Sequence, residues 1–284
     1  MGKGRGEGRM ELSFCSPASR RVAAFTMVEI AISLAVIAFA LVAIIGVLPS
    51  GMTAQRENRE ETIINQDASI YIDAIRNGAR GMDHLTNYVY AILNHWTEYQ
   101  IQSNAPTDIL TNVNRSGLDA YYDTNSDIQS IASPPVIPLT NGLRIIGLMS
   151  RPKYEVFPTS IRSNFVVAYA RAQSGVASEK PPQANADVRA DSFAYRVICD
   201  NQKVQVYSDP VPLPAGATNV TPHLTHNLRE LRLTFGWPLN ALGKPGNGRQ
   251  TYRMEVGGNL QTITDPFVAH PLFFFRPTTF VKAP

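Results

Sequence analysis

Residues 24–51, AFTMVEIAISLAVIAFALVAIIGVLPSG, decide how this chain is built. Residues 30–48 within this stretch contain no formally charged side chain. A helix of that length spans about 28 Å, close to the thickness of the hydrocarbon core of a bilayer. A secretory signal peptide has a shorter apolar region followed by small residues at a cleavage site, whereas this stretch continues into Leu48-Pro49-Ser50. We therefore expect a retained transmembrane helix.

The charges that flank this segment predict its orientation. Arg20 and Arg21 precede it, and the residues after it have mixed charge with a slight acidic excess: Arg56, Glu57, Arg59, Glu60 and Glu61. Basic residues stay on the cytoplasmic side of a membrane helix. We expect a single-pass protein of the bacterial inner membrane, with a cytoplasmic N-terminus and a periplasmic C-terminal head.

Glu29 is an acidic residue beside a long apolar run. A carboxylate at the centre of a bilayer costs about 2.5–3.5 kcal/mol, and less near the interface. Two interpretations follow. Glu29 lies shallow and reaches water or the Arg20–Arg21 pair, or it is paired with a cation of another subunit.

The order of residues around Glu29 resembles the processing site of type IV prepilins and type II secretion pseudopilins. A basic leader ends at Ala24 and is followed by Phe25, Thr26, Met27, Val28, Glu29 and the apolar run. The resemblance implies that a prepilin peptidase cuts between Ala24 and Phe25 and methylates the new N-terminal amine. It also implies that Glu29 of a neighbouring subunit neutralises this amine and fixes the stagger between helices. The family usually has Gly before the cut, so Ala24 implies less efficient processing.

This resemblance implies a structural role. The subunit would assemble in the inner membrane into a pseudopilus, or a pilus-like filament of a type II secretion or type IV pilus-like system. Its partners would be the prepilin peptidase, other prepilin-like subunits and the inner-membrane assembly platform. Residues 49–51 and 234–238 also resemble the Verru-Chthon cassette protein B family of prepilin-like proteins. The alternative is a periplasmic adhesion or binding module on a pilin anchor, with long loops at 103–140, 174–190 and 209–227 as its surface.

The pattern after the membrane segment predicts a helical stem. Pro49 should kink the helix, and an apolar stripe of helical spacing follows: Ile63, Ile64, Ala68, Tyr71, Ile72 and Ile75. Gly78 and Gly81 predict its end. We expect a second helix beginning at Asp83, because Leu85, Tyr88, Val89, Ile92, Leu93 and Trp96 form another stripe. The polar segment 103–140 is expected to be a long loop.

The rest of the head predicts antiparallel strands. Alternating apolar residues indicate strands at 143–149, 164–170, 193–199, 203–207, 228–237 and 251–256. The predicted fold is α+β, with a long kinked transmembrane helix packed on an antiparallel pilin-like head. The predicted segments are a cytoplasmic leader at 1–24, a transmembrane helix at 25–48, an amphipathic stem at 49–80 and a periplasmic globular head at 81–284.

Charge and composition disfavour nucleic-acid binding and catalysis. The net charge of +3 arises wholly in residues 1–24, and the remainder has 21 basic and 21 acidic residues, so it offers no broad attraction for polyanions. No convergent set of acid, base and nucleophile is evident, and we expect neither an enzyme nor a cofactor. His223 and His226 are expected to be surface residues. Asp123 opens a stretch that resembles a calcium loop but has Ile128 where Gly is needed, and we expect no metal site.

Cysteine usage agrees with an exported head. The chain has two cysteines, Cys15 and Cys199, and removal of the leader leaves no pair for an intrachain disulfide. A head of this size can depend on its apolar core. Cys15 loosely resembles a lipoprotein site, but no apolar run precedes it and Phe14 is bulky. Cys199 lies on the apolar side of a predicted strand, and we expect it to be a buried thiol.

Overall fold

The computed structural model describes residues 25–78, 82–102, 109–122, 137–174, 193–205, 221–240, 242–268 and 270–282. The chain divides into two compact units, residues 1–57 and 58–284. The fold is α+β, as the sequence predicts, with one long N-terminal helix and a mixed sheet.

Helix α1 extends over Met27–Asn77 and is continuous through Pro49. Its residues from 58 onward belong to the second unit, and the predicted apolar stripe is buried there except for Ile72, which is half-buried: Ile63, Ile64, Ala68, Tyr71 and Ile75. The helix ends at Gly78, whose φ of +71° lies in the left-handed region that glycine tolerates best. The predicted stop at Gly81 lies outside the described residues.

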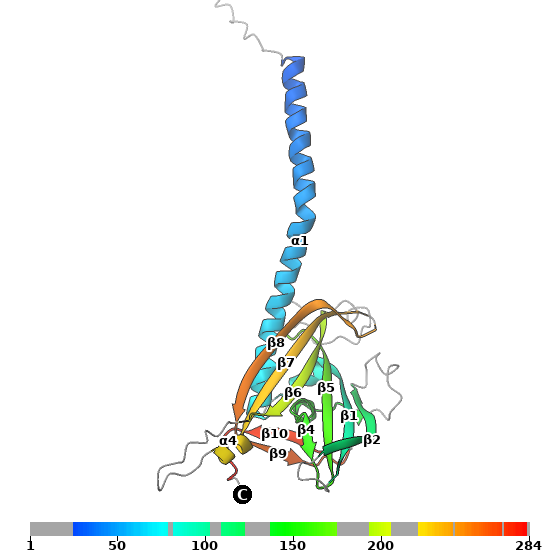
Figure 1. Ribbon diagram of the computed structural model, residues 1–284. Coiled ribbons are helices and arrows are strands. Elements are labelled where there is room, and N and C mark those ends of the chain that lie inside the picture. The colour runs from blue at the N-terminus through cyan, green and yellow to red at the C-terminus, as the bar shows by residue number, and fades with distance from the viewer. Residues whose placement is uncertain are drawn as a thin grey trace, which may run out of the picture. The chain divides into compact units, whose positions relative to one another are not determined.

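A large sheet forms the second unit (Figure 1). Its strand order is β3-β2-β1-β5-β6-β7-β8, with β4 paired to β5. All neighbours are antiparallel except β2 and β3, which are parallel. The strands are β1 (Val89–Gln102), β2 (Ile109–Tyr122), β3 (Ile137–Pro138), β4 (Tyr154–Val156), β5 (Ser160–Arg171), β6 (Ala194–Lys203), β7 (Leu228–Leu239) and β8 (Pro245–Gly257).

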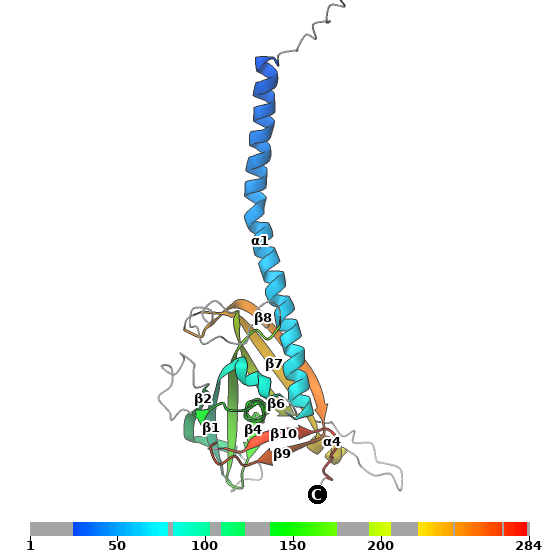
Figure 2. The ribbon, with the colours of Figure 1, turned by 180° about the vertical axis from the view of Figure 1, so that it is seen from behind.

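Smaller elements complete this unit. A 3₁₀ helix, η1 (Asp83–Asn87), precedes β1, and two short helices follow later in the chain, α2 (Gly142–Met149) and α4 (Thr221–Asn227). Strands β9 (Asn259–Ile263) and β10 (Leu272–Arg276) form a separate antiparallel pair. Figure 2 shows this unit from behind, with the last turns of α1 lying over the sheet.

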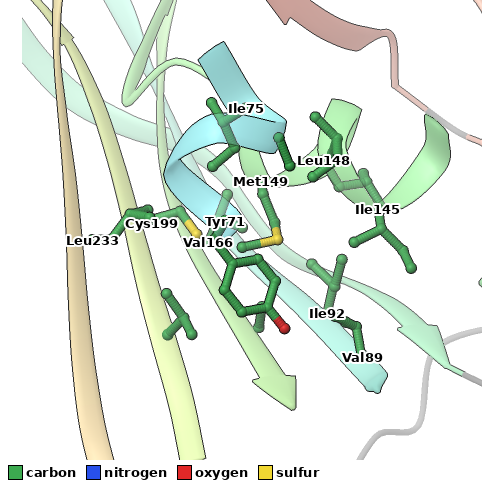
Figure 3. Close-up of a cluster of buried hydrophobic side chains, with 14 of the residues drawn as sticks. Tyr71, Ile75, Val89, Ile92, Ile145, Leu148, Met149, Val166, Cys199 and Leu233 are labelled. Carbon is green, nitrogen blue, oxygen red and sulfur yellow. The ribbon is translucent and has the colours of Figure 1, made fainter. Parts of the chain in front are cut away.

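The main core lies between one face of the sheet and the elements that cover it (Figure 3). α1 contributes Tyr71 and Ile75, α2 contributes Ile145 and Met149, and the sheet and β10 supply the remaining side chains. The predicted inward faces of β6 and β7 are confirmed, because these residues are buried: Tyr195, Val197, Cys199, Leu231, Leu233, Phe235 and Trp237. Cys199 is buried in this core, as predicted, and its burial raises the pKa of the thiol.

Asp67 fastens α1 to the head. It is fully buried, and both of its carboxylate oxygens accept hydrogen bonds. Oδ1 accepts from the backbone N–H of Ser174 at 3.0 Å and from its hydroxyl at 2.6 Å. Oδ2 accepts from the backbone N–H of Gln173 at 2.9 Å and from the hydroxyl of Tyr195 at 2.7 Å. Four donors thus replace the water that this carboxylate lost on burial.

The predicted second helix is wrong, because residues 89–102 form the central strand β1. The strand has a register irregularity between Val89 and Ala91. As a result Val89 and Ile92 face the main core, while Tyr90, Ala91 and Leu93 belong to a small cluster that includes Ala120 and Tyr122. A bulge adds one residue to the strand period. The inward-facing Val89 and Ile92 are therefore three residues apart, a spacing that is also typical of a helix.

Three further predictions differ from the structure. Residues 142–149 form helix α2, not a strand; nearly every residue in it is buried, so no alternation distinguishes the two. Segment 103–140 contains β2, whose residues 114–116 are polar and exposed because only the two residues of β3 lie beyond this strand. Strand β6 is continuous from Ala194 to Lys203, so the strands predicted at 193–199 and 203–207 are not separated at residues 200–202. Strands β9 and β10 were not predicted.

Candidate functional site

The apolar segment predicted to cross the membrane is helical and exposed on all sides within this chain. Every residue from Ile30 to Leu48 is exposed, including Phe39 at 79% and Ile45 at 69%. A helix that is apolar all round is buried in a protein core or in a bilayer. Within the described residues, α1 is the one helix long and apolar enough to cross a membrane.

Polar groups along this segment are satisfied within the helix. The Ser33 hydroxyl donates to the carbonyl of Ile30 at 2.9 Å, and that of Ser50 donates to the carbonyl of Val47 at 2.8 Å. These local bonds leave no hydroxyl of α1 without an acceptor at those positions. The surface of the segment is therefore compatible with hydrocarbon.

A capping box closes the start of α1. The Oε2 atom of Glu29 accepts from the Thr26 backbone N–H at 3.1 Å and from the Thr26 hydroxyl at 3.0 Å. In return, the Thr26 hydroxyl oxygen lies 3.3 Å from the Glu29 backbone nitrogen and accepts its N–H. This reciprocal pattern satisfies two donors that a helix N-terminus would otherwise leave open. Glu29 thus has a structural function within its own chain.

The predicted processing and assembly residues lie at this helix start. Ala24 lies outside the described residues, and Phe25 is 79% exposed immediately before α1. No cationic side chain among the described residues pairs with Glu29. Sequence reasoning missed Thr26, although the Thr-x-x-Glu spacing of residues 26–29 is the signal of a capping box.

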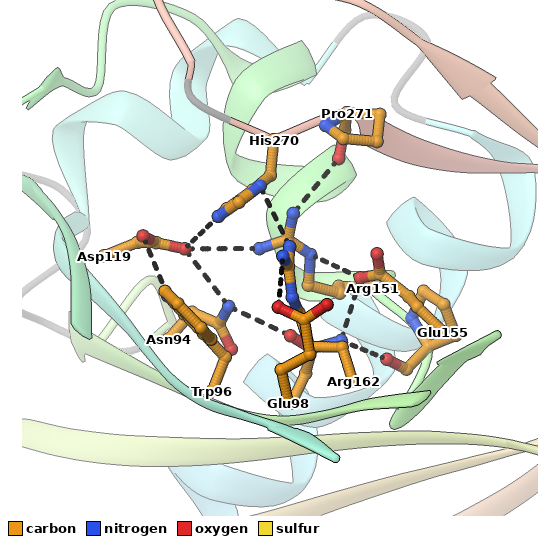
Figure 4. A network of polar contacts seen from close by, with 11 residues as sticks. Asn94, Trp96, Glu98, Asp119, Arg151, Glu155, Arg162, His270 and Pro271 are labelled. Carbon is orange, nitrogen blue, oxygen red and sulfur yellow. Dashed lines mark hydrogen bonds and ion pairs between the residues drawn. The ribbon is translucent and has the colours of Figure 1, made fainter. Parts of the chain in front are cut away.

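A second candidate is a polar network in the head (Figure 4). Arg151, which is 1% exposed, follows α2 and lies with its Nε 3.1 Å from Oε1 of Glu155 and with its Nη1 3.6 Å from Oδ2 of Asp119. The Nδ2 atom of Asn164 donates to the same Glu155 oxygen at 2.8 Å. The Nε1 atom of Trp96 donates to Oδ1 of Asp119 at 3.2 Å. The network joins β1, β2, β4 and β5.

His270 lies in this network between an acid and a guanidinium. The Nη1 atom of Arg162 is 3.1 Å from Nδ1 of His270, and because arginine can only donate, Nδ1 accepts. The proton of the neutral ring is then on Nε2, which lies 3.4 Å from Oδ2 of Asp119. Burial lowers the pKa of His270, and the nearby guanidiniums of Arg151 and Arg162 lower it further, against the opposing effect of Asp119.

Arg162 makes two further contacts in this network, one with an aromatic ring and one with an acid. Arg162 stacks on Trp96, with its guanidinium carbon 4.8 Å from the ring centroid, and its Nη2 lies 3.5 Å from Oε2 of Glu98. The hydroxyl of Ser160 donates to Oε1 of Glu98, and the same Glu98 carboxylate is engaged by Arg162 through Oε2.

The metal-binding interpretations of the sequence find no site in the described residues. His223 and His226 lie on α4, and no three potential metal ligands gather anywhere in the part of the chain that the structure describes. The Asp123–Ile128 segment lies outside it.

Comparison with known proteins finds no relative. No family model matches the chain, and neither a curated protein nor a solved structure is significantly similar to it.

Proposed function

We propose that this chain is a prepilin-like subunit of the bacterial inner membrane. In this proposal the leader is removed between Ala24 and Phe25, the apolar part of α1 packs against helices of other subunits, and the head lies in the periplasm. The observation on which it rests is the exposed apolar segment 30–48 of α1, which comes directly after Glu29 and follows a basic leader. The prepilin peptidase, sister subunits and an assembly platform are its partners.

Two structural features support this proposal. An N-terminal helix whose last turns pack on a largely antiparallel sheet is the pilin-like arrangement that the resemblance implies. The apolar segment is also left exposed by the described part of its own chain, so packing against other helices or lipid would cover it. Cleavage before Phe25 would place a cationic amine four residues from Glu29, at the membrane edge.

Charge pairing and helix capping predict different behaviour for variants at this site. Glu29→Gln keeps the capping box, since glutamine also accepts from Thr26, but loses the negative charge. Thr26→Ala weakens the cap and keeps the charge. If Glu29 pairs with the amine of a neighbour, crosslinking between subunits is lost in Glu29→Gln and retained in Thr26→Ala.

The experiment uses full-length protein in its native membrane, with a cysteine introduced at Ala38 in the apolar segment and oxidative crosslinking as the readout. Mass analysis of the extracted protein gives the N-terminus in parallel, where we expect methylated Phe25. An intact Met1, or a cut after residue 45, would refute the prepilin proposal. A crosslinking pattern that Glu29→Gln leaves unchanged would refute the charge pairing.

A further inference from the structure

A cavity lies at the end of β6 and β7, on the side of the sheet that faces the core. Its volume is about 690 Å³, within the range of about 300–1,000 Å³ typical of ligand pockets. Strands β4, β9 and β10 also contribute to its wall through Val156, Leu260 and Phe273. All of these elements belong to the second unit, so the cavity does not depend on the membrane segment.

Two cations line this cavity from adjacent strands. Lys203 and Arg229 are direct partners in the antiparallel register of β6 and β7. They share the face of Asn201 and Leu231, which are buried at 0% and 1% exposure. Lys203 is exposed and Arg229 is half-buried at this end of the sheet, and like charges directly opposite each other destabilise a sheet. The fold alone does not explain this pair.

Arg229 has no acidic partner among the described residues. Its closest polar contact is a long one, 3.5 Å from Nη1 to Oδ1 of Asn201, and its buried Nε has no acceptor. Burial lowers the pKa of Arg229 to about 10, so it keeps its charge at neutral pH. The two buried arginines of the described residues are paired, Arg144 with Asp265 at 2.8 Å and Arg151 with Glu155 at 3.1 Å.

Apolar groups surround the two cations. Leu260 and Phe273 line the cavity, and Val156 and Phe157 lie at its edge, where Val156 is 72% exposed. The one acid in the lining, Glu155, is already engaged by Arg151 and Asn164. Among the described residues, the cavity therefore offers positive charge without an acidic partner next to apolar side chains.

We propose that this cavity binds a carboxylate that is attached to an apolar group. Arg229 and Lys203 hold the carboxylate, and Leu260, Phe273 and Val156 cover the apolar part. Guanidinium and carboxylate match in geometry and form charge-assisted hydrogen bonds. Such a group occurs at the C-terminus of a peptide that ends in an apolar residue, and in a free aliphatic or aromatic acid.

The test measures binding to the full-length protein in nonionic detergent by isothermal titration calorimetry. The probes are N-acetyl-leucyl-phenylalanine with a free carboxylate, the same dipeptide as its carboxamide, and 4-methylpentanoate. We expect the free dipeptide to bind at least tenfold more tightly than the carboxamide, which also controls for partition into micelles. If 4-methylpentanoate binds as tightly as the dipeptide, the site takes free acids; if only the dipeptide binds, it takes chain termini.

Variants separate the pocket from general charge effects. Arg229→Met should weaken binding of the free dipeptide at least tenfold, and Arg229→Lys should restore part of it. Arg232→Met is the matched control, because Arg232 lies on the same strand, faces the other way and is paired with Glu230. Thermal unfolding of each variant confirms that it is folded. Equal binding of carboxylate and carboxamide, no binding at millimolar concentration, or unchanged binding by a folded Arg229→Met would each overturn the proposal.

Discussion

Replacing Asp67 with asparagine should weaken the hydrogen bonds that join α1 to the head and lower the free energy of unfolding. Asparagine has nearly the same shape, so packing around the site is preserved and the change is in hydrogen bonding. Each carboxylate oxygen of Asp67 accepts two bonds, one from a backbone N–H and one from a hydroxyl. The amide keeps one oxygen and turns its NH₂ toward the other two donors.

The magnitude follows from these four bonds. Two charge-assisted bonds are lost, at about 1.5–3 kcal/mol each. The hydroxyl on the affected side can rotate and accept from the new NH₂, which returns about 1 kcal/mol, while the backbone N–H stays without a partner. The free energy of unfolding should therefore fall by about 2–5 kcal/mol.

Urea unfolding of the full-length protein in detergent measures this loss. Trp96 and Trp237 both lie in the head, so their fluorescence reports its unfolding directly. Asp73→Asn is the matched control, since Asp73 lies on the same helix and is exposed, and it should change stability by less than about 0.5 kcal/mol. A loss for Asp67→Asn no larger than that of the control would refute the reasoning.

Two further predictions concern the helix end and the polar network. Gly78→Ala should lower the free energy of unfolding by about 1–3 kcal/mol, because φ is +71° and a Cβ would lie 2.8 Å from the carbonyl oxygen of Phe275. Gly257→Ala is the control and should be nearly neutral in the same urea assay, because a Cβ there would meet only a ring atom of Phe280 at 4.0 Å. His270 has a folded-state pKa below its ordinary value of 6.5, so the unfolded chain binds its proton first and stability falls as pH decreases below about 6.5. Urea unfolding at pH 5.5 and 7 should show a smaller difference in His270→Gln than in the unchanged protein, and an equal difference would contradict the assignment.

The sequence predicts the parts of the fold in which each residue faces one environment. Strand β6 alternates strictly in burial, with Val197 inward and Arg196 outward, and in β7 Leu231 and Leu233 are buried on either side of half-buried Arg232, so these faces can be identified from the period of two. The stripe from Ile63 to Ile75 could be identified because one face of the last part of α1 is buried and the other is exposed.

The predictions of secondary structure are wrong where an element is buried on nearly all sides, or where a bulge shifts the period of its buried side chains. Helix α2 is buried on nearly all sides, so its apolar run has no period to distinguish helix from strand. Asn141 is its N-cap, since the Asn141 side chain accepts from the Arg144 backbone N–H at 2.8 Å, and the prediction did not include it. In β1 the irregularity after Val89 is set by pairing with β5, which is distant in sequence.

The pocket could not be predicted because its residues come from segments far apart. Lys203 and Arg229 become neighbours only through the register of β6 and β7, and Leu260 and Phe273 come from a strand pair that the sequence did not indicate. The processing motif at Ala24, Phe25 and Glu29 is contiguous, and for that reason it could be identified from the sequence, although its function stays a prediction.

The capping box has a consequence for how Glu29 would meet a neighbouring subunit. Both bonds from Thr26 go to Oε2, and within the described residues Oε1 makes no hydrogen bond. One oxygen therefore fixes the side chain on its own helix while the other stays open to a cation. The carboxylate is preorganised, so an incoming amine would not bear the entropy cost of ordering it, about 0.5–1.5 kcal/mol for a flexible side chain.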